Sequence, residues 1–337
     1  MLLWLEIALG PLNTAILTPY FSSREQPIQY FQDANYELKP FVFFSTLLYG
    51  IKLAYIHLVL FYDKIKNYQF LISLVSKMHP YVNVAVMAAR RAAKIIIRYL
   101  DEIDSLKIKE KGLNDFVTWV DENAENAIIE TIQKSYPSHA ILGEETGNHP
   151  GEEYTWIIDP LDGTLNYLHG FPQFAVSIGI QYKQQIEHAV IYDPLSQDLY
   201  TATRGRGAQL NGRRIRVSKC EGLASALIGS SFPFQNRSEF IDKHYDIFKH
   251  VFLQSADVRR TGSAALNLAY VAAGRLDGFW ESGLKPWDIA AGVLLVREAG
   301  GFVSDFNGEN NFFENGTIIA GTRKVRSDLL EIIKTHG

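Results

Sequence analysis

Cysteine is nearly absent from this sequence, which holds a single one, Cys220, among 337 residues. One cysteine excludes an internal disulfide, and without a cysteine partner it also excludes a thiolate zinc site of the zinc-finger type. This cysteine usage is typical of a reducing compartment, so we expect a cytoplasmic protein. The nine histidines form no His-x-x-x-His pair, which excludes the histidine zinc site of many metalloproteases.

Several motifs of common enzyme classes are missing as well. The sequence has no Gly-x-x-x-x-Gly-Lys-Ser/Thr loop, which excludes P-loop nucleotide hydrolases, and no Gly-x-Ser-x-Gly nucleophile elbow. The glycines of Gly205–Gly207 lack the spacing of a dinucleotide-binding loop. Haloacid-dehalogenase-type phosphatases need an aspartate nucleophile two residues before the Asp of Asp-Gly-Thr. Here Pro160 stands two residues before Asp162, so that covalent route lacks its nucleophile.

Positive charge is scarce in the larger part of the chain. Residues 78–337 carry 27 basic and 32 acidic side chains. Nonspecific nucleic-acid binding needs a basic face that displaces counterions, so we expect no direct binding to nucleic acid. An acidic surface suits a protein that binds metal cations.

The first 77 residues differ in composition from the rest of the chain. They hold 15 of the 42 aromatic residues but only 11 of the 70 charged residues and 2 of the 25 glycines. Their most apolar run, residues 41–62, is long enough to span a bilayer at about 20 residues per crossing. Lys52 lies near its centre, however, and a central lysine costs roughly 2.5–3.5 kcal/mol on insertion.

Three interpretations of residues 1–77 stay open. They form a membrane anchor, a loosely packed extension of unknown role, or upstream sequence translated from a wrongly chosen start. Met1–Ala15 is a poor signal peptide because Glu6 replaces the basic segment and Pro11 interrupts a short apolar stretch. Met78 opens a well-patterned amphipathic helix, which favours the extension or the wrong start over the anchor.

Hydrophobic periodicity after Met78 predicts helices alternating with short strands. We expect helices over 80–101, 118–135, 263–273 and 288–299, strands over 156–158, 174–182 and 188–192, and a hairpin of 199–204 with 213–217 around Asn211-Gly212. A polar hinge is expected over 107–115. This pattern divides the chain into an α+β half, residues 78–220, and an α/β half, residues 221–337.

The segment Trp156–Thr164 is the most informative part of the sequence. An apolar strand leads into Asp159, Pro160 prevents the strand from continuing regularly, and Gly163-Thr164 begins a helix. Asp159 and Asp162 are therefore expected to project toward the same space, where a Mg²⁺ ion could bridge them to a substrate phosphate. The alternative is a simple helix cap, with Asp162 capping and Asp159 solvated.

Three further acidic positions strengthen the metal interpretation. Glu144 follows the strand-like Ala140–Leu142, Asp288 precedes a predicted helix, and Asp121 lies in the first turn of another. Each has an ordinary explanation on its own: a solvated loop, a helix cap, and a favourable interaction with the helix dipole. Together they are four acidic sites at strand ends and helix starts.

These motifs resemble the inositol monophosphatase family. The resemblance rests on Gly143-Glu144-Glu145, on Asp159–Asn166 and on Trp287–Gly292 with Glu298–Gly301, whose order and spacing all match. It covers residues 78–337 and is greatest to the bacterial inositol-1-monophosphatase branch, of which Arg259–Ala265 and Gly283–Asp288 are typical. It implies a layered αβαβα sandwich of the inositol monophosphatase and fructose-1,6-bisphosphatase type, Mg²⁺-dependent phosphomonoesterase activity, inhibition by Li⁺ and a homodimer.

The resemblance also implies roles for individual residues. Two or three Mg²⁺ ions are expected at each active site, with Asp121 and Thr164 as the pair that orients and deprotonates the attacking water. The implied metal ligands are Glu144, Asp159, the carbonyl of Leu161, Asp162 and Asp288. The implied substrate contacts are Asp162, Gly163, Thr164, Arg259, Ala264, Glu281 and Asp288, with Glu281 reaching inositol hydroxyls. Leu165 and Asn267 depart from common family residues, and neither is an implied metal ligand.

The expected activity is hydrolysis of inositol 1-phosphate, a small phosphorylated polyol, by a metal-activated water. Within the same fold, a 3′-phosphoadenosine nucleotide, fructose bisphosphate or NADP are alternative substrates. The bacterial branch also suggests a binding role with the transcription machinery beside catalysis. A membrane-attached enzyme is a third hypothesis, which depends on residues 41–62.

Overall fold

The computed structural model describes residues 78–100, 108–112, 115–232 and 237–337, with only the backbone at 108–112, 115–118 and 237–240. The chain divides into two compact units, Met1–Ser73 and Leu74–Gly337, and the description below concerns the second. The predictions for residues 1–77, including the membrane anchor at 41–62, lie outside the described residues. Among the described helices, none has the length and apolar character needed to cross a membrane.

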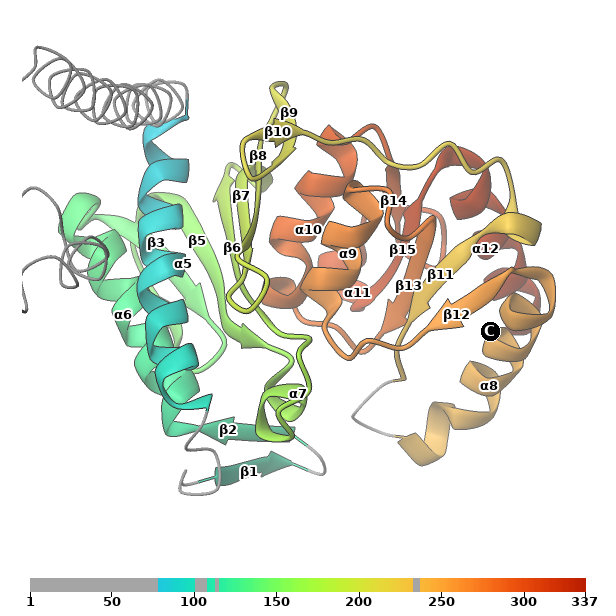
Figure 1. Cartoon of the computed structure of the whole chain (residues 1–337), viewed down its shortest axis with the longest axis horizontal. Helices are drawn as coiled ribbons and strands as arrows, with labels where there is room; N and C mark the ends of the chain where they lie inside the picture. The colour runs from blue at the N-terminus through green and yellow to red at the C-terminus, as the bar shows by residue number, and fades with distance from the viewer. Residues whose placement is uncertain (1–77, 101–107, 113–114, 233–236) are drawn as a thin grey trace, which may run out of the picture. The chain divides into compact units, whose positions relative to one another are not determined.

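The second unit is built of five alternating layers of helices and sheets (Figure 1). The first layer consists of helices α5 (Pro80–Arg98) and α6 (Trp119–Ser135). The second layer is an eight-stranded sheet, in the order β10 (Arg213–Arg214), β9 (Gly207–Leu210), β8 (Asp198–Thr203), β7 (Gln185–Asp193), β6 (Ala175–Tyr182), β5 (Glu152–Asp162), β3 (His139–Gly143) and β4 (Gly147–His149).

Helices α9 (Ala264–Ala272) and α10 (Pro286–Glu298) form the third layer, between the two sheets. The fourth layer is a five-stranded sheet, in the order β12 (Asp257–Arg259), β11 (Leu227–Ser230), β13 (Gly278–Ser282), β15 (Thr317–Gly321) and β14 (Phe302–Ser304). Helices α8 (Arg237–Gln254) and α12 (Arg323–His336) cover its other face. The arrangement is the αβαβα sandwich that the resemblance implied.

The two sheets differ in strand direction. All neighbouring pairs of the first sheet are antiparallel except β3 and β5, which run parallel with Gly143 opposite Ile158. In the second sheet β12, β11 and β13 are parallel, whereas β15 is antiparallel to both β13 and β14. The parallel β3–β5 pair brings the ends of two strands to the same edge, which matters for the site described below.

Three hydrophobic cores lie between the layers, and the alternation of side chains along single strands separates them. On β5, Trp156 and Ile158 face the core under α5 and α6, whereas Ile157 faces α9 and α10. On β13, Phe279 belongs to that central core and Trp280 to the third core, under α8 and α12. Each sheet therefore buries both of its faces.

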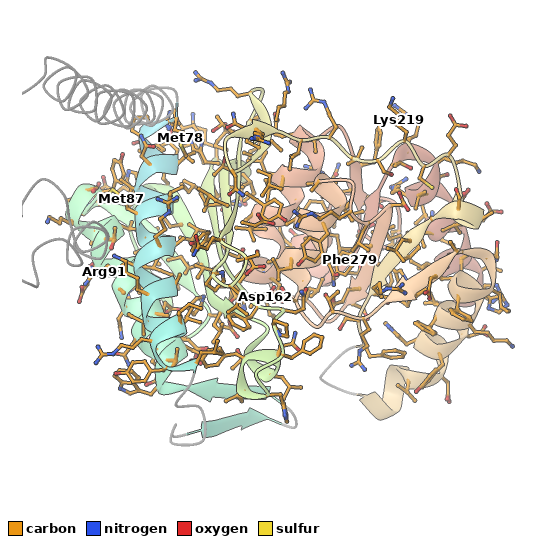
Figure 2. The ribbon with its side chains drawn as sticks, viewed as in Figure 1. Met78, Met87, Arg91, Asp162, Lys219 and Phe279 are labelled. Atoms are coloured by element: carbon orange, nitrogen blue, oxygen red, sulfur yellow. The ribbon has the colours of Figure 1, made fainter. Side chains whose placement is uncertain are left out.

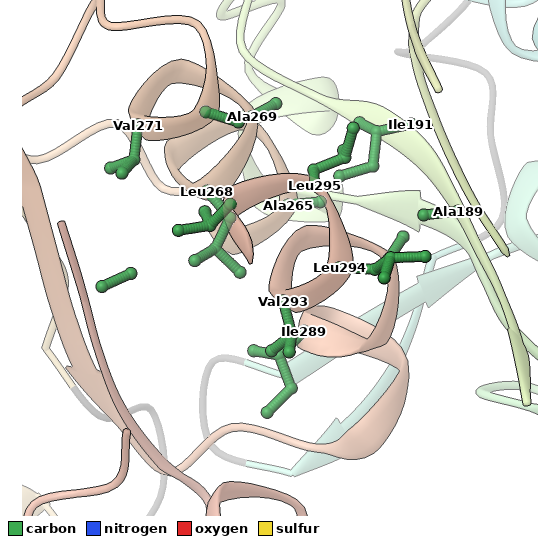
Figure 3. Packing of buried hydrophobic residues seen from close by; sticks show 14 of the residues in the cluster. Ala189, Ile191, Ala265, Leu268, Ala269, Val271, Ile289, Val293, Leu294 and Leu295 are labelled. Carbon is green, nitrogen blue, oxygen red and sulfur yellow. The ribbon is translucent and has the colours of Figure 1, made fainter. Parts of the chain in front are cut away.

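The central core joins the two sheets through α9 and α10. Figure 3 shows Leu294 and Leu295 of α10 beside Ala189 and Ile191 of β7. A methyl group added at Gly179 of β6 would come within 2.7 Å of the Cβ of Ala290, so the helix packs directly on the strand backbone. Close packing of this kind fixes the first turn of α10 relative to the first sheet.

The predicted helix over 80–101 begins as expected and ends earlier. The ring of His79 accepts a hydrogen bond from the Tyr81 N–H, and Pro80 occupies the first turn, so the start is capped. The helix ends at Arg98, with Tyr99 as its C-cap residue. The helix predicted over 118–135 is α6, which begins at Trp119.

Two predictions for the strands are wrong. The polar hinge over 107–115 contains a strand instead, since β1 (Ile108–Gly112) pairs antiparallel with β2 (Asp115–Thr118). The predicted hairpin of 199–204 with 213–217 does not form. Strand β8 pairs with β9, and Asn211-Gly212 turns the chain from β9 into the short β10. No strand was predicted over 207–210, where the four-residue β9 lies between two glycine-containing turns.

Candidate active site

The strand β5 changes course where the sequence places Asp159-Pro160-Leu161-Asp162. Asp159 pairs with Ser177 of β6 and Asp162 pairs with Ala175, so two residues of β5 oppose one residue of β6. This bulge follows from Pro160, which has no N–H to donate to the ladder. The strand continues to Asp162, four residues beyond the predicted end at Ile158, and both aspartates are buried.

Asp159 lies at the centre of the acidic residues. Its side chain is 1 % exposed, and Oδ1 accepts a hydrogen bond of 2.9 Å from the Leu161 N–H. Burial raises the pKa of Asp159 well above its usual value, and the negative charges of Glu144, Asp162 and Asp288 raise it further. Three of the acidic sites in the sequence, Asp159–Asp162, Glu144 and Asp288, are thus close enough for their charges to interact.

Asp162 links the first sheet to α9. Its Oδ2 accepts hydrogen bonds from the Ser263 hydroxyl and, at 2.8 Å, from the Ala265 N–H. Burial raises the pKa of Asp162 to about 6, although the bonds from Ser263 and from the Ala265 and Ala264 N–H groups lower it. The carboxylate therefore stabilises the N-terminus of α9, where the helix dipole favours a negative charge.

The alternative interpretation, in which Asp162 caps the helix after it, is wrong. That helix, α7 (Thr164–Leu168), has Gly163 as its N-cap residue, and Gly163 makes no side-chain cap. Gly163 has φ +96°, and an added Cβ would lie 2.8 Å from the carbonyl oxygen of Gln173. Only glycine suits this position, because the left-handed backbone and the neighbouring carbonyl both disfavour a side chain.

Asp121 and Thr164 meet although 43 positions separate them in the sequence. Asp121 is 1 % exposed in the first turn of α6, and its Oδ1 lies 3.0 Å from the Thr164 hydroxyl. The same hydroxyl lies 3.1 Å from the carbonyl oxygen of Leu161. A hydroxyl has a single proton, so it donates to one of these oxygens at a time and can exchange between them.

Glu144 and Asp288 approach the aspartates of β5 from two other elements. The Glu144 N–H donates to the carbonyl oxygen of Ile158 at 3.2 Å, which sets Glu144 beside the end of β5. Asp288 lies in the first turn of α10, where its Oδ2 accepts a 2.7 Å hydrogen bond from the Lys285 N–H. The helix begins at Pro286, two residues before the predicted start, so Asp288 is inside the helix.

Glu281 of β13 is a further buried carboxylate, which is 4 % exposed. Burial raises the pKa of Glu281 well above its usual value, as do the charges of Asp288 and Asp162, whereas Ser231 and Arg260 lower it. Its Oε2 has no hydrogen-bond partner among the described residues. A buried acceptor without a partner needs one from outside the chain.

The two remaining residues that the resemblance implies as substrate contacts, Ala264 and Arg259, differ in burial. Ala264 is buried at the first position of α9, next to the groups that bind Asp162. Arg259 is exposed and forms an ion pair of 2.5 Å with Asp257, whereas the neighbouring Arg260 is the cation that acts on Glu281. Sequence reasoning missed Arg260, although the pair of adjacent arginines was a signal for it.

Sequence reasoning also missed Glu125, which is completely buried on α6. It lies four residues after Asp121, and the acidic residue on an otherwise apolar helix face was the available signal. Figure 2 marks Asp162 near the boundary between the first sheet and the α9–α10 layer, where these groups converge.

The atoms around Asp159 and Asp162 that could bind a metal ion are all oxygen atoms. Hard divalent cations such as Mg²⁺ take carboxylate and carbonyl oxygens, so these residues fit that ion. Mutual repulsion raises the pKa of the buried carboxylates, and a bound cation would offset it. The arrangement can therefore hold a divalent cation next to a hydroxyl–carboxylate pair that accepts a proton.

The sequence is similar to those of known proteins. The sequence model of the Inositol monophosphatase family matches residues 77–336. The protein "Nus factor SuhB" of Pseudomonas aeruginosa is 50% identical over 264 residues, which cover 77% of this chain and 97% of that protein.

Solved structures of related proteins have the same fold. The extragenic suppressor protein suhB from Bartonella henselae is 42% identical with a TM-score of 0.74, covering 76% of this chain and 99% of that one. The inositol monophosphatase from Anabaena (Nostoc) is 36% identical with a TM-score of 0.69, covering 76% of this chain and 96% of that one.

Proposed function

Because the chain belongs to the inositol monophosphatase family, we propose that it is a Mg²⁺-dependent phosphomonoesterase that hydrolyses inositol 1-phosphate to inositol and phosphate. The observation that carries the proposal is the convergence of Glu144, Asp162 and Asp288 on the buried Asp159. The hydrogen-bonded pair of Asp121 and Thr164 adds a proton acceptor just after the end of β5.

Two sets of oxygen donors would hold the metal ions. Glu144, Asp159 and the carbonyl of Leu161 form the first set, and Asp159, Asp162 and Asp288 form the second. When bound, Mg²⁺ lowers the pKa of a bound water and stabilises the oxygen that leaves phosphorus. The raised pKa of Asp159 supports this assignment, because burial and the negative charges of Glu144, Asp162 and Asp288 raise it and a bound cation would offset these effects.

The chain's own groups position the reactants and move the proton. Thr164 Oγ1 orients the attacking water, and Asp121 accepts the proton through that hydroxyl, because the two atoms are 3.0 Å apart. The N–H groups of Gly163 and Thr164 hold the phosphate oxygens, since Gly163 admits a close approach of the backbone. Phosphoryl transfer needs mainly such positioning and charge stabilisation.

The polyol side of the substrate is assigned to Glu281. Its Oε2 lacks a partner among the described residues, and inositol hydroxyls would donate to it. Ala264 lines the same part of the site, and the exposed Arg259 is assigned a contact with the substrate. A panel that includes a 3′-phosphoadenosine nucleotide, fructose bisphosphate and NADP tests the preference. A turnover on any of these above that on inositol 1-phosphate would contradict it.

The experiment on the full chain compares Asp159→Asn with wild type for phosphate release from inositol 1-phosphate, with Mg²⁺ and with added Li⁺. We expect wild-type release to need Mg²⁺ and to fall with Li⁺, and the variant to lose at least about a hundredfold in turnover. Asp328→Asn, a surface substitution on α12 in an ion pair with Lys324, is the matched control. Near-wild-type turnover of Asp159→Asn at saturating Mg²⁺ would refute the assignment.

A second function is favoured by the relatives, since the Pseudomonas aeruginosa protein carries the name Nus factor. We infer that this chain also binds the transcription machinery. Asp121→Asn separates the two functions, because it removes the proton acceptor without altering the surface. Association with RNA polymerase complexes is expected to persist in Asp121→Asn, and its loss along with the activity would contradict an independent binding role.

The proposal extends to a cytoplasmic homodimer, which rests on the family resemblance and on the reducing compartment that the single cysteine suggests. Light scattering of the full chain tests the mass. Fractionation of cells tests whether residues 41–62 attach the protein to a membrane instead.

A further inference from the structure

Glu125 is a completely buried carboxylate that the proposed chemistry does not use. It lies on α6 four residues after Asp121, so the two side chains share one face of the helix, one turn apart. Asp121 meets Thr164, whereas Glu125 reaches the segment that joins β3 to β4. That segment contains Glu144.

The carboxylate of Glu125 fills this turn and accepts three hydrogen bonds in it. Its Oε2 accepts the Glu145 N–H at 2.9 Å. Its Oε1 accepts the Thr146 N–H at 2.8 Å and the Thr146 hydroxyl at 2.5 Å. Three donors to one carboxylate compensate the loss of water around it, which burial of a charged group requires.

The turn is fixed on both sides of Glu144. The Glu144 N–H is bound to the carbonyl of Ile158 on β5, while the next two N–H groups, of Glu145 and Thr146, are bound to Glu125. Three successive backbone donors are therefore engaged. The backbone around Glu144 is held in this conformation, because each of these N–H groups would lose its hydrogen bond in another one.

Gly143 shows how tightly the carboxylate is enclosed. A Cβ built at Gly143 would lie 2.5 Å from Oε1, 2.6 Å from Cδ and 2.8 Å from Oε2 of Glu125. Any side chain at Gly143 would displace the carboxylate. The glycine is therefore needed for the close approach of the strand end to Glu125.

We propose that Glu125 is a positioning residue that fixes the 143–146 turn so that the carboxylate of Glu144 faces Asp159. This inference rests on the proposed function, in which Glu144 and Asp159 hold Mg²⁺. Because Glu125 shares α6 with Asp121, the same helix sets the place of the metal ligand and of the proton acceptor. Groups that orient a metal ligand change metal affinity about 10- to 100-fold when they are removed.

The test uses Glu125→Gln in the full chain, which keeps the volume of the side chain but points an amide N–H₂ at backbone donors. Calorimetry measures Mg²⁺ binding, and hydrogen exchange of the metal-free protein measures the Glu145 and Thr146 amides. We expect Mg²⁺ affinity to fall at least about tenfold and both amides to exchange at least about tenfold faster. The turnover at saturating Mg²⁺ stays within about threefold, since no reacting group is altered.

Two further variants complete the design. Glu130→Gln, on the exposed face of α6, is the matched control and is expected to leave both readouts unchanged. Thr146→Val removes only the hydroxyl and keeps a similar shape, so it tests the turn if Glu125→Gln does not fold. We expect Thr146→Val to weaken Mg²⁺ binding by about threefold, since one of the three hydrogen bonds to Glu125 is lost together with the 2.7 Å hydrogen bond between the hydroxyl and His149 Nε2.

The outcomes separate this inference from the proposed function. Unchanged Mg²⁺ affinity in folded Glu125→Gln or Thr146→Val, or unchanged exchange at Glu145 and Thr146 in folded Glu125→Gln, would overturn the positioning role. A lowered melting temperature alone, without these changes, would also overturn it, because a residue that only stabilises the fold predicts that result. Absence of phosphate release by wild type would refute the proposed function, while the Mg²⁺ and exchange readouts would still decide the role of Glu125.

Discussion

Acidification from pH 7 to pH 5 should weaken the fold through one histidine, His188 of β7. The side chain is 5 % exposed, its ring stacks on that of His79 with 4.1 Å between centroids, and its Nδ1 lies 3.1 Å from the Thr203 hydroxyl. Burial lowers the pKa of His188 to about 4, and the positive charges of His79 and Arg206 contribute to the shift. The folded protein therefore keeps this imidazole neutral under conditions in which an exposed imidazole is charged.

The sign of the effect follows from the two pKa values. The unfolded chain takes up the proton near pH 6.5, and the folded chain does so only near pH 4. The stability contributed by the neutral imidazole is thus complete above pH 6.5 and is lost as the pH falls toward 4. The difference between these two pKa values corresponds to about 3 kcal/mol, of which about 2 kcal/mol is lost between pH 7 and pH 5.

Urea unfolding of wild type and of His188→Gln at both pH values measures this contribution. Glutamine has no proton to gain here, so we expect the wild type to lose about 2 kcal/mol more free energy of unfolding than the variant on going from pH 7 to pH 5. His169→Gln, which alters an exposed histidine, is the control and should match wild type. An identical pH dependence in wild type and His188→Gln would refute the reasoning.

Two further substitutions test local features of the fold. Gly163→Ala places a Cβ 2.8 Å from the Gln173 carbonyl oxygen at φ +96°, so we expect the free energy of unfolding to fall by about 1–3 kcal/mol and phosphate release to be lost; wild-type values in both assays would contradict the assigned backbone geometry. Tyr167→Phe removes the 3.0 Å hydrogen bond from a buried hydroxyl to the Ile96 carbonyl oxygen. It should cost about 1–2 kcal/mol in thermal unfolding while the Mg²⁺ dependence stays unchanged, and an altered Mg²⁺ dependence would show that this contact reaches the site.

The elements that could be predicted best from the sequence are those whose apolar periodicity lies within the element itself. The helices α5, α9 and α10 and the strands β5, β6 and β7 follow from apolar periodicity together with prolines and glycines at their ends. The second sheet was harder. Strands such as Leu227–Ser230 and Gly278–Ser282 are four or five residues long and contain glycine, so their pattern cannot be distinguished from loop.

The hinge expected over 107–115 shows a different limit. The strand β1 contains Lys109, Glu110 and Lys111, so it has no apolar alternation to reveal it. It is a strand because β2 pairs with it, and pairing is a property of two segments. The wrongly predicted hairpin has the same cause. Whether β8 pairs with β9 or with the segment after it depends on which of two turns joins the paired strands, and one segment alone does not show this.

For the candidate site, the sequence supplied the acidic groups but not the residues that support them. Asp159 and Asp162 were expected to converge because a strand end and a helix start follow each other within a few residues. Glu125 and Arg260 act on residues about 20 positions away, at Glu145 and at Glu281. Contacts of this kind depend on tertiary packing, which no local pattern encodes.

Asp162 belongs to the first sheet, yet its partners Ser263 and Ala265 open a helix about a hundred residues later in the chain. A ribosome that has synthesised only the first half has made Asp121, Glu144, Asp159 and Thr164 but neither α9 nor Asp288. The acidic groups made by then lack the dipole of α9, and the proposed metal site lacks its last carboxylate. The proposed active site is therefore completed only late in synthesis, when α9 and Asp288 have been made.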